Sequence, residues 1–137
     1  MWLIHISIIL KFIKNGKVII MEGIYEKYGG QGFWDAIIDQ FYDKNMSDSS
    51  LRGFFEGKNI DKIKAMNRHL LSVALRTTEE HFSVSVKRVH RGFGIGAANF
   101  DKFVSNFKRV LDDNKISEDD AEYIVMVVES FRDDVLV

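Results

Sequence analysis

The sequence predicts a single all-α domain behind a short N-terminal extension. Apolar residues recur at three- and four-residue steps from Met21 onward, which is the spacing of amphipathic helices. The 137 residues, of which 46% are hydrophobic, suit one compact domain, and the absence of proline fits long uninterrupted helices. We therefore expect an accessory extension over residues 1–20 and a helical domain over residues 21–137.

The composition excludes several classes of site and partner. No cysteine is present, so disulfides, thiol catalysis, zinc–thiolate sites and iron–sulfur clusters are excluded, and histidine and carboxylate remain as metal ligands. The net charge of −1, with 28% charged residues of both signs, gives no overall attraction to nucleic acid or to an anionic membrane. We expect no nucleic-acid partner and a cytoplasmic location.

The first twenty residues differ in character from the rest. Residues 2–13 are mostly apolar but too short to span a bilayer, and the lysines follow this stretch, which is the wrong polarity for a secretory signal. We therefore expect no transmembrane segment. Asn15-Gly16 lies between two apolar runs and is a strong two-residue turn signal, so a β-hairpin is the favoured interpretation. The alternatives are an amphipathic or partner-binding arm, and an accessory extension to a chain that naturally starts at Met21.

The helical pattern opens with two segments separated by glycines. A short helix is expected over Gly23 to Lys27, and Gly29-Gly30 ends it because glycine adopts backbone conformations closed to other residues. A second helix is expected from about Phe33 to Lys44. Its inward positions are Ile37, Ile38, Phe41 and Tyr42.

A bent corner and a third helix follow. Ser47 to Ser50 is turn-like, and Leu51 to Phe55 carries paired aromatic residues before Gly57 breaks the chain. The third helix is expected from about Asn59 to Arg76. Its inward stripe comprises Ile60, Ile63, Met66, Asn67, Leu70, Leu71 and Ala74.

Three further helical segments follow, and only the first of them has clear start and end signals in the sequence. Thr77-Thr78 with Glu80 is a helix-start signal, and Gly92 and Gly94 end the segment that it opens. The inward positions of that segment are Phe82, Val86, Val89 and His90. A fifth helix places Phe100, Phe103, Val104, Phe107 and Leu111 in register, and a sixth places Ile124, Val125, Val128 and Phe131.

Three polar residues occupy positions that the helical register assigns to the interior. Tyr42, Asn67 and His90 each carry groups that need a hydrogen-bond partner or a ligand when buried. Each can be satisfied separately within the core, or one ligand lodged between the helices can be served by all three. A haem fits the second interpretation, because a neutral imidazole can bind iron while Tyr42 and Asn67 donate to dioxygen on the other side.

Four motifs, in order, resemble those of the truncated haemoglobin family, group I. They are Ile24-Tyr25-Glu26-Lys27-Tyr28-Gly29-Gly30, then Asp39-Gln40-Phe41-Tyr42, then Leu51-Arg52-Gly53-Phe54-Phe55-Glu56-Gly57, and finally Val89-His90-Arg91-Gly92-Phe93-Gly94-Ile95. The resemblance covers roughly residues 23–136 with little gapping. The order and separation of the four motifs make the resemblance far more specific than any single motif.

The resemblance implies a two-over-two helical sandwich around haem b, in which the helix near His90 is short. It assigns His90 to the iron, and Tyr42 to the distal side as the principal hydrogen-bond donor, with Asn67 orienting it or contacting the ligand less directly. Phe55 is assigned to the haem face. The other implied distal residues are Ile63, Met66 and Leu71, and the implied wall residues are Phe82, Val86, Val89, Ile95, Phe103, Ile124 and Val128.

The function implied is reversible binding of dioxygen and other diatomics, nitric oxide and carbon monoxide among them, with oxygen transport or nitric oxide detoxification as the role. A nitric oxide dioxygenase activity would need a separate reductase, because the chain has no flavin- or nicotinamide-binding motif. A haem-based gas sensor or ligand-dependent interaction module, docking a partner through residues 1–20, is the alternative. A haem-free helical domain with a structural His90 is a third.

The sequence departs from the family pattern at three places. Residues 75–78 lack the usual second glycine pair, so the following loop is expected to differ. Met66 stands where some members have a lysine or histidine able to bind iron, and a methionine on the inner face of a helix is more often a core residue than a ligand. Asn67 replaces a commoner glutamine. His69 is expected at the solvent edge.

Overall fold

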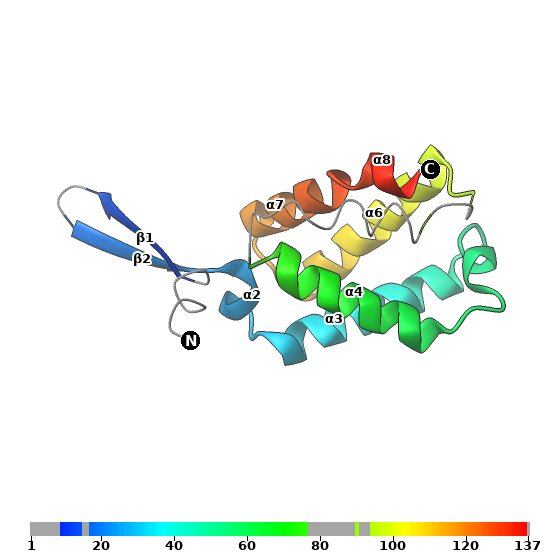
Figure 1. The fold of residues 1–137 in the computed structure, drawn as a ribbon, viewed down its shortest axis with the longest axis horizontal. Helices are drawn as coiled ribbons and strands as arrows, with labels where there is room; N and C mark the ends of the chain where they lie inside the picture. The colour runs from blue at the N-terminus through cyan, green and yellow to red at the C-terminus, as the bar shows by residue number, and fades with distance from the viewer. Residues whose placement is uncertain (1–8, 15–16, 77–89, 91–93, 137) are drawn as a thin grey trace.

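A β-hairpin precedes the helical body. The computed structural model describes residues 9–14, 17–76, 90 and 94–136. Strands β1 (Ile9–Lys14) and β2 (Lys17–Glu22) pair antiparallel, with Ile9 opposite Glu22, and Figure 1 shows them projecting from the helices. The pairing agrees with the predicted hairpin; its predicted turn, Asn15-Gly16, lies outside the described residues.

The described body of the chain is helical, as predicted. Its elements are α2 (Ile24–Lys27), α3 (Gln31–Ser47), a 3₁₀ helix η1 (Arg52–Phe55), α4 (Ile60–Ala74), α6 (Ala97–Asp113), α7 (Glu118–Glu129) and α8 (Arg132–Val135). Helices α3 and α4 pack side by side, α6 packs on α7, and α3 joins the two pairs through α6 (Figure 1). This is the expected two-over-two sandwich. Within the described residues no helix is both long and apolar enough to cross a membrane.

Local signals explain most helix boundaries. Gly30, at φ 70°, lets the chain turn directly into α3. The side chain of Asn59 accepts a hydrogen bond from the Lys62 amide at 3.2 Å and caps α4, and Ser117 caps α7 in the same way through Asp120. The Asn59 cap agrees with the predicted start of the third helix.

Two boundaries differ from the prediction. Helix α3 runs on to Ser47, whose hydroxyl donates to the Asp43 carbonyl at 2.8 Å and so stays within the last helical turn. The predicted sixth helix is divided: α7 ends at Glu129, and Phe131 begins the short α8. At the break the Ser130 hydroxyl donates to the Val127 carbonyl at 2.5 Å, a local bond of the kind that competes with helix continuation.

The main core lies where α3 meets α6 and α7. Trp34, 1% exposed, donates its indole N–H to the Tyr25 carbonyl at 2.8 Å and thereby holds α2 against α3. An ion pair of 2.8 Å between Lys27 and Asp120 joins the end of α2 to the start of α7. The fully buried core residues around them include Ile37, Val110, Leu111, Ala121 and Ile124.

One polar pair is buried inside this apolar core. Asn45 on α3 is 0% exposed and Asn106 on α6 is 5% exposed. The Asn106 amide donates to the Asn45 side-chain oxygen at 3.0 Å, while Asn45 Nδ2 has no partner among the described residues. The two longest helices of the body are therefore joined by a hydrogen bond shielded from water.

Candidate functional site

A largely apolar cavity lies between the two helix pairs. Its described walls come from α3, η1, α4, α6, α7 and α8, together with His90 and Ile95. Tyr42, Asn67 and His90 are its only described lining residues with an oxygen- or nitrogen-bearing side chain. The helices thus bring together the three polar residues that the register placed in the interior.

Most residues predicted for the site line this cavity. They are Tyr42, Phe55, Ile63, Met66, Asn67, Leu71, His90, Ile95, Phe103, Ile124 and Val128. The other predicted wall residues, Phe82, Val86 and Val89, lie outside the described residues, as does the predicted atypical loop after Arg76. The short helix expected near His90 is described only at His90 itself.

Tyr42 projects from α3 into the cavity and is 6% exposed. Its ring meets the edge of Phe55 at a centroid distance of 5.6 Å and that of Phe41 at 5.1 Å, so neighbouring aromatic rings restrict it. Burial raises the pKa of the Tyr42 phenol above its ordinary value, and the hydrogen-bonding side chain of Asn67 opposes that rise. The hydroxyl is therefore held in its proton-bearing form, as a hydrogen-bond donor requires.

This raised pKa predicts that Tyr42→Phe lessens the loss of stability at alkaline pH. The folded protein keeps the phenol proton at pH values where the unfolded chain releases it, so stability present below about pH 10 is lost as the pH rises. At about pH 11 this residue should account for a loss of roughly 1 kcal/mol of the free energy of unfolding. Urea unfolding of both proteins at about pH 8 and about pH 11 measures the difference. An equal alkaline loss in the two proteins would contradict the raised pKa.

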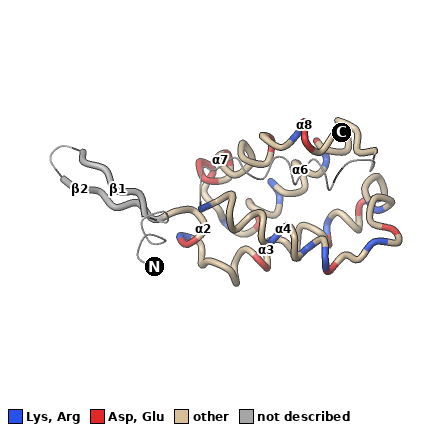
Figure 2. Tube along the Cα trace, viewed as in Figure 1, with Lys and Arg blue, Asp and Glu red and all other residues tan. Residues whose placement is uncertain are grey.

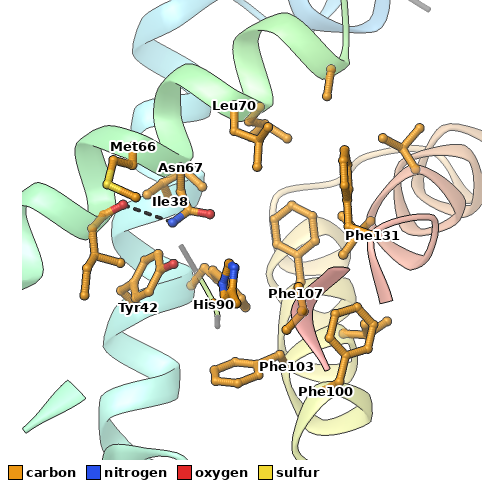
Figure 3. Close-up of a pocket in the computed structure, with 18 of the residues that line it drawn as sticks. Ile38, Tyr42, Met66, Asn67, Leu70, His90, Phe100, Phe103, Phe107 and Phe131 are labelled. Carbon is orange, nitrogen blue, oxygen red and sulfur yellow. Dashed lines mark hydrogen bonds between the residues drawn. The ribbon is translucent and has the colours of Figure 1, made fainter. Parts of the chain in front are cut away.

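Asn67 is fixed from its own helix. Its Nδ2 donates to the Ile63 carbonyl, four residues earlier in α4, at 3.0 Å. Figure 3 shows the Asn67 nitrogen directed toward the Tyr42 hydroxyl, and the same two side chains interact in setting the Tyr42 pKa. The Asn67 amide therefore lies beside the Tyr42 hydroxyl.

His90 and Met66 also line the cavity, and Met66 lies next to Asn67 on α4. The His90 side chain is partly buried, and Figure 3 shows its imidazole facing the same space as Tyr42 and Asn67. Met66, on α4, is 39% exposed, more than any other described lining residue, so it lies at the mouth of the cavity. His69 is exposed, as predicted.

Sequence reasoning did not assign twelve further lining residues to the site. Many of them, such as Ile38, Phe100 and Phe107, were predicted as inward, but the helical register cannot separate a cavity wall from solid core. Val127 and Val135 lie outside the inward positions predicted for the sixth helix. The remaining residues of this group are Phe41, Phe54, Leu70, Ala74, Leu75, Val104 and Phe131.

The site offers one imidazole, one phenol donor and one amide within apolar walls. No group of three or more His, Cys, Asp or Glu side chains able to hold a metal ion occurs among the described residues. A metal at His90 would therefore need its remaining ligands from a cofactor rather than from the described part of the chain.

Comparison with known proteins identifies the family. The model of the bacterial-like globin family matches residues 23–137. The group 1 truncated hemoglobin GlbN of Mycolicibacterium paratuberculosis is 30% identical over 77 residues, 56% of this chain and 57% of that protein. The group 1 truncated hemoglobin of Tetrahymena pyriformis is 24% identical over 115 residues, 84% of this chain and 95% of that protein.

Solved structures show the same fold. The Fe(III) form of the Tetrahymena pyriformis protein superposes with a TM-score of 0.75 at 23% identity, covering 84% of this chain and 98% of that one. The cyanomet 2/2 hemoglobin of a Synechococcus species, with covalently attached heme, gives a TM-score of 0.72 at 24% identity and covers 83% and 98%. The chain belongs to the bacterial-like globin family, whose members bind haem b and diatomic gases, and the curated proteins that it resembles are named group 1 truncated hemoglobins.

Proposed function

We propose that this chain holds haem b in the cavity with His90 as the iron ligand, binds dioxygen beside Tyr42, and uses it to oxidise nitric oxide to nitrate. The observation that supports this most is the convergence of Tyr42, Asn67 and His90 on a cavity whose other described walls are apolar. Apolar walls would suit a porphyrin, and the single imidazole of His90 would supply a ligand to its iron.

Each residue of the cavity would have a separate role in binding haem and gas. When bound, haem supplies an iron coordination position for a diatomic gas and the redox chemistry of nitric oxide oxidation. His90 would bind the iron, while Phe55 and Phe103, whose rings meet edge to face at 6.1 Å, would cover the porphyrin and exclude water. The Tyr42 hydroxyl would donate a hydrogen bond to the gas, and Asn67 would hold Tyr42 in place.

Absorption spectroscopy with and without added haemin tests the first part of the proposal. We expect a Soret band from the purified protein or after haemin addition. Its absence in both samples would remove the haem function altogether. Stopped-flow mixing of the dioxygen-loaded protein with nitric oxide tests the second part, with nitrate as the expected product. Release of unreacted dioxygen would instead leave reversible binding of dioxygen, carbon monoxide and nitric oxide as the function.

Met66→Leu is expected to leave the ferrous absorption spectrum unchanged. A thioether can bind haem iron, but Met66 is 39% exposed at the cavity mouth, and leucine has a similar volume and the same apolar character. The spectrum of the ferrous protein without added gas is compared in the two forms. A six-coordinate spectrum that disappears in the variant would show instead that Met66 is a ligand.

The hairpin supports one alternative role. Strands β1 and β2 lie ahead of residues 23–137, which match the globin family, and project from the body (Figure 1). We propose residues 1–20 as an accessory unit and residues 21–137 as the globin domain. If the protein is a gas-dependent interaction module, deletion of residues 1–20 should abolish partner capture in a pull-down while leaving the Soret band intact.

A further inference from the structure

Helix α7 presents an exposed face that the haem site does not use. Asp119, Glu122, Tyr123 and Met126 are spaced at three-, four- and seven-residue steps and therefore share one side of the helix. All four are exposed, with Tyr123 at 41% and Met126 at 61%. We call these four residues the α7 outer face. Tyr123 and Met126 are the two most exposed large hydrophobic residues in the described part of the chain.

The segment around this face is strongly acidic. Residues 112–134 contain nine acidic residues and two basic ones, although the whole chain is nearly neutral. Figure 2 shows acidic positions along α7 and α8. The carboxylates of Asp120 and Glu129 pair with Lys27 and Arg132 at 2.8 and 2.9 Å.

The acids of the α7 outer face differ from these paired carboxylates. Neither Asp119 nor Glu122 forms an ion pair with another described residue, and both are exposed. Their charges are therefore available to a positively charged surface, and they flank the Tyr123 and Met126 side chains in the helical register. An apolar centre with charged residues at its edge is the usual arrangement of a protein-docking surface.

The opposite side of the same helix lines the cavity. Ile124, Val127 and Val128 belong to the cavity wall, so only the thickness of one helix, about 10 Å, separates the outer face from the cavity lining. A protein bound to the α7 outer face would therefore come close to a redox group held in the cavity. Few contacts and strong charge steering suit the brief encounters of electron transfer.

We propose that the α7 outer face docks a cationic electron-donor protein that reduces the haem. This inference rests on the proposed function, because conversion of one dioxygen and one nitric oxide to nitrate consumes one electron, which the partner supplies by its own oxidation. Asp119 and Glu122 attract the basic surface of the donor, and Tyr123 and Met126 pack against its apolar centre. The acidic charge disfavours nucleic acid and anionic lipid as occupants.

Electron exchange with a defined cationic protein tests the docking face. Ferrous holoprotein is mixed anaerobically with ferric cytochrome c, which serves as a basic probe. In this test the electron passes from the haem to the probe, the reverse of the proposed physiological direction. The rate of electron transfer is measured at low and at high salt. Asp119→Asn with Glu122→Gln is expected to slow the low-salt rate about tenfold and to weaken its salt dependence. Tyr123→Ser with Met126→Ser should slow the rate at both salt concentrations.

A charge-matched pair of substitutions is the control. Asp43→Asn with Glu56→Gln removes the same two charges from exposed positions on α3 and after η1, and should leave the rate within about twofold of the unsubstituted protein. If this pair slows transfer as much as the α7 pair does, net charge rather than a docking face sets the rate, and the proposal is overturned.

Cross-linking separates this proposal from the proposed function. A carbodiimide joins carboxylates to the lysines of bound cytochrome c whether or not haem is present, and we expect the cross-links at Asp119 and Glu122. Cross-links at these residues in a protein that makes no nitrate would refute the dioxygenase and retain the docking face. Nitrate production with cross-links only elsewhere would refute the docking face and retain the dioxygenase.

Discussion

His90→Ala is expected to weaken haem binding by more than about 100-fold. Outer-shell partners of metal ligands already contribute roughly 10- to 100-fold to metal affinity, and the direct ligand contributes more. No other histidine lines the described cavity, so the described walls offer no replacement imidazole. Titration of the protein with haemin, followed at the Soret band, measures the change.

His69→Ala and added imidazole are the matched tests of this result. His69 is exposed on α4 and outside the cavity lining, so its replacement should leave haem affinity unchanged. Imidazole in the buffer should restore an imidazole-ligated spectrum to the His90→Ala protein, because the small molecule can occupy the vacated volume. Unchanged haem affinity in His90→Ala would show that the histidine is structural and that iron is bound elsewhere.

Tyr42→Phe is expected to speed dioxygen release about 10- to 100-fold. A hydrogen bond to a partly charged ligand in a buried site is worth about 1.5–3 kcal/mol, and that difference appears mainly in the dissociation rate. The ring itself is retained, so its edge contact with Phe55 at 5.6 Å should survive. Stopped-flow displacement of dioxygen by carbon monoxide measures the rate.

Tyr28→Phe controls for the loss of a phenol hydroxyl as such. The Tyr28 hydroxyl donates to Asp120 at 2.6 Å, and this residue does not line the cavity. Its replacement should leave dioxygen release unchanged even if it lowers stability. An unchanged dioxygen off-rate in Tyr42→Phe would show that Tyr42 is not the hydrogen-bond donor to dioxygen and would leave Asn67 as the candidate donor.

The sequence was most informative where residues within a single element determine its boundaries. The start of α4 follows from the Asn59 cap, and the break between α2 and α3 follows from Gly29-Gly30, at φ 125° and 70°; both are short-range effects. The hairpin strands follow from an apolar run on each side of Asn-Gly. The division of the last helix was missed, because the apolar spacing continues through Ser130 while its hydroxyl favours a break.

The site was harder to predict than the fold. Helical register identifies an inward residue, but whether Phe107 faces solid core or an open cavity depends on how far apart α3 and α6 are held, which is a tertiary property. The position of Met66 at the cavity mouth also depends on neighbouring elements, since register alone counts it as core. Charge shows the same limit: the acidic run of residues 112–134 can be read from the sequence, but only the helix α7 places Asp119 and Glu122 on one exposed face.

The Asn45–Asn106 pair has a consequence for how uniquely the cavity is shaped. Apolar side chains alone would tolerate α3 sliding along α6 by a helical turn, at modest cost. Such a slip would separate the two amides and leave both without their mutual hydrogen bond in the core. Asn45 lies one turn after Tyr42, and Asn106 adjoins Phe107. The pair thus selects one alignment of the two helices, and with it one width of the cavity between them.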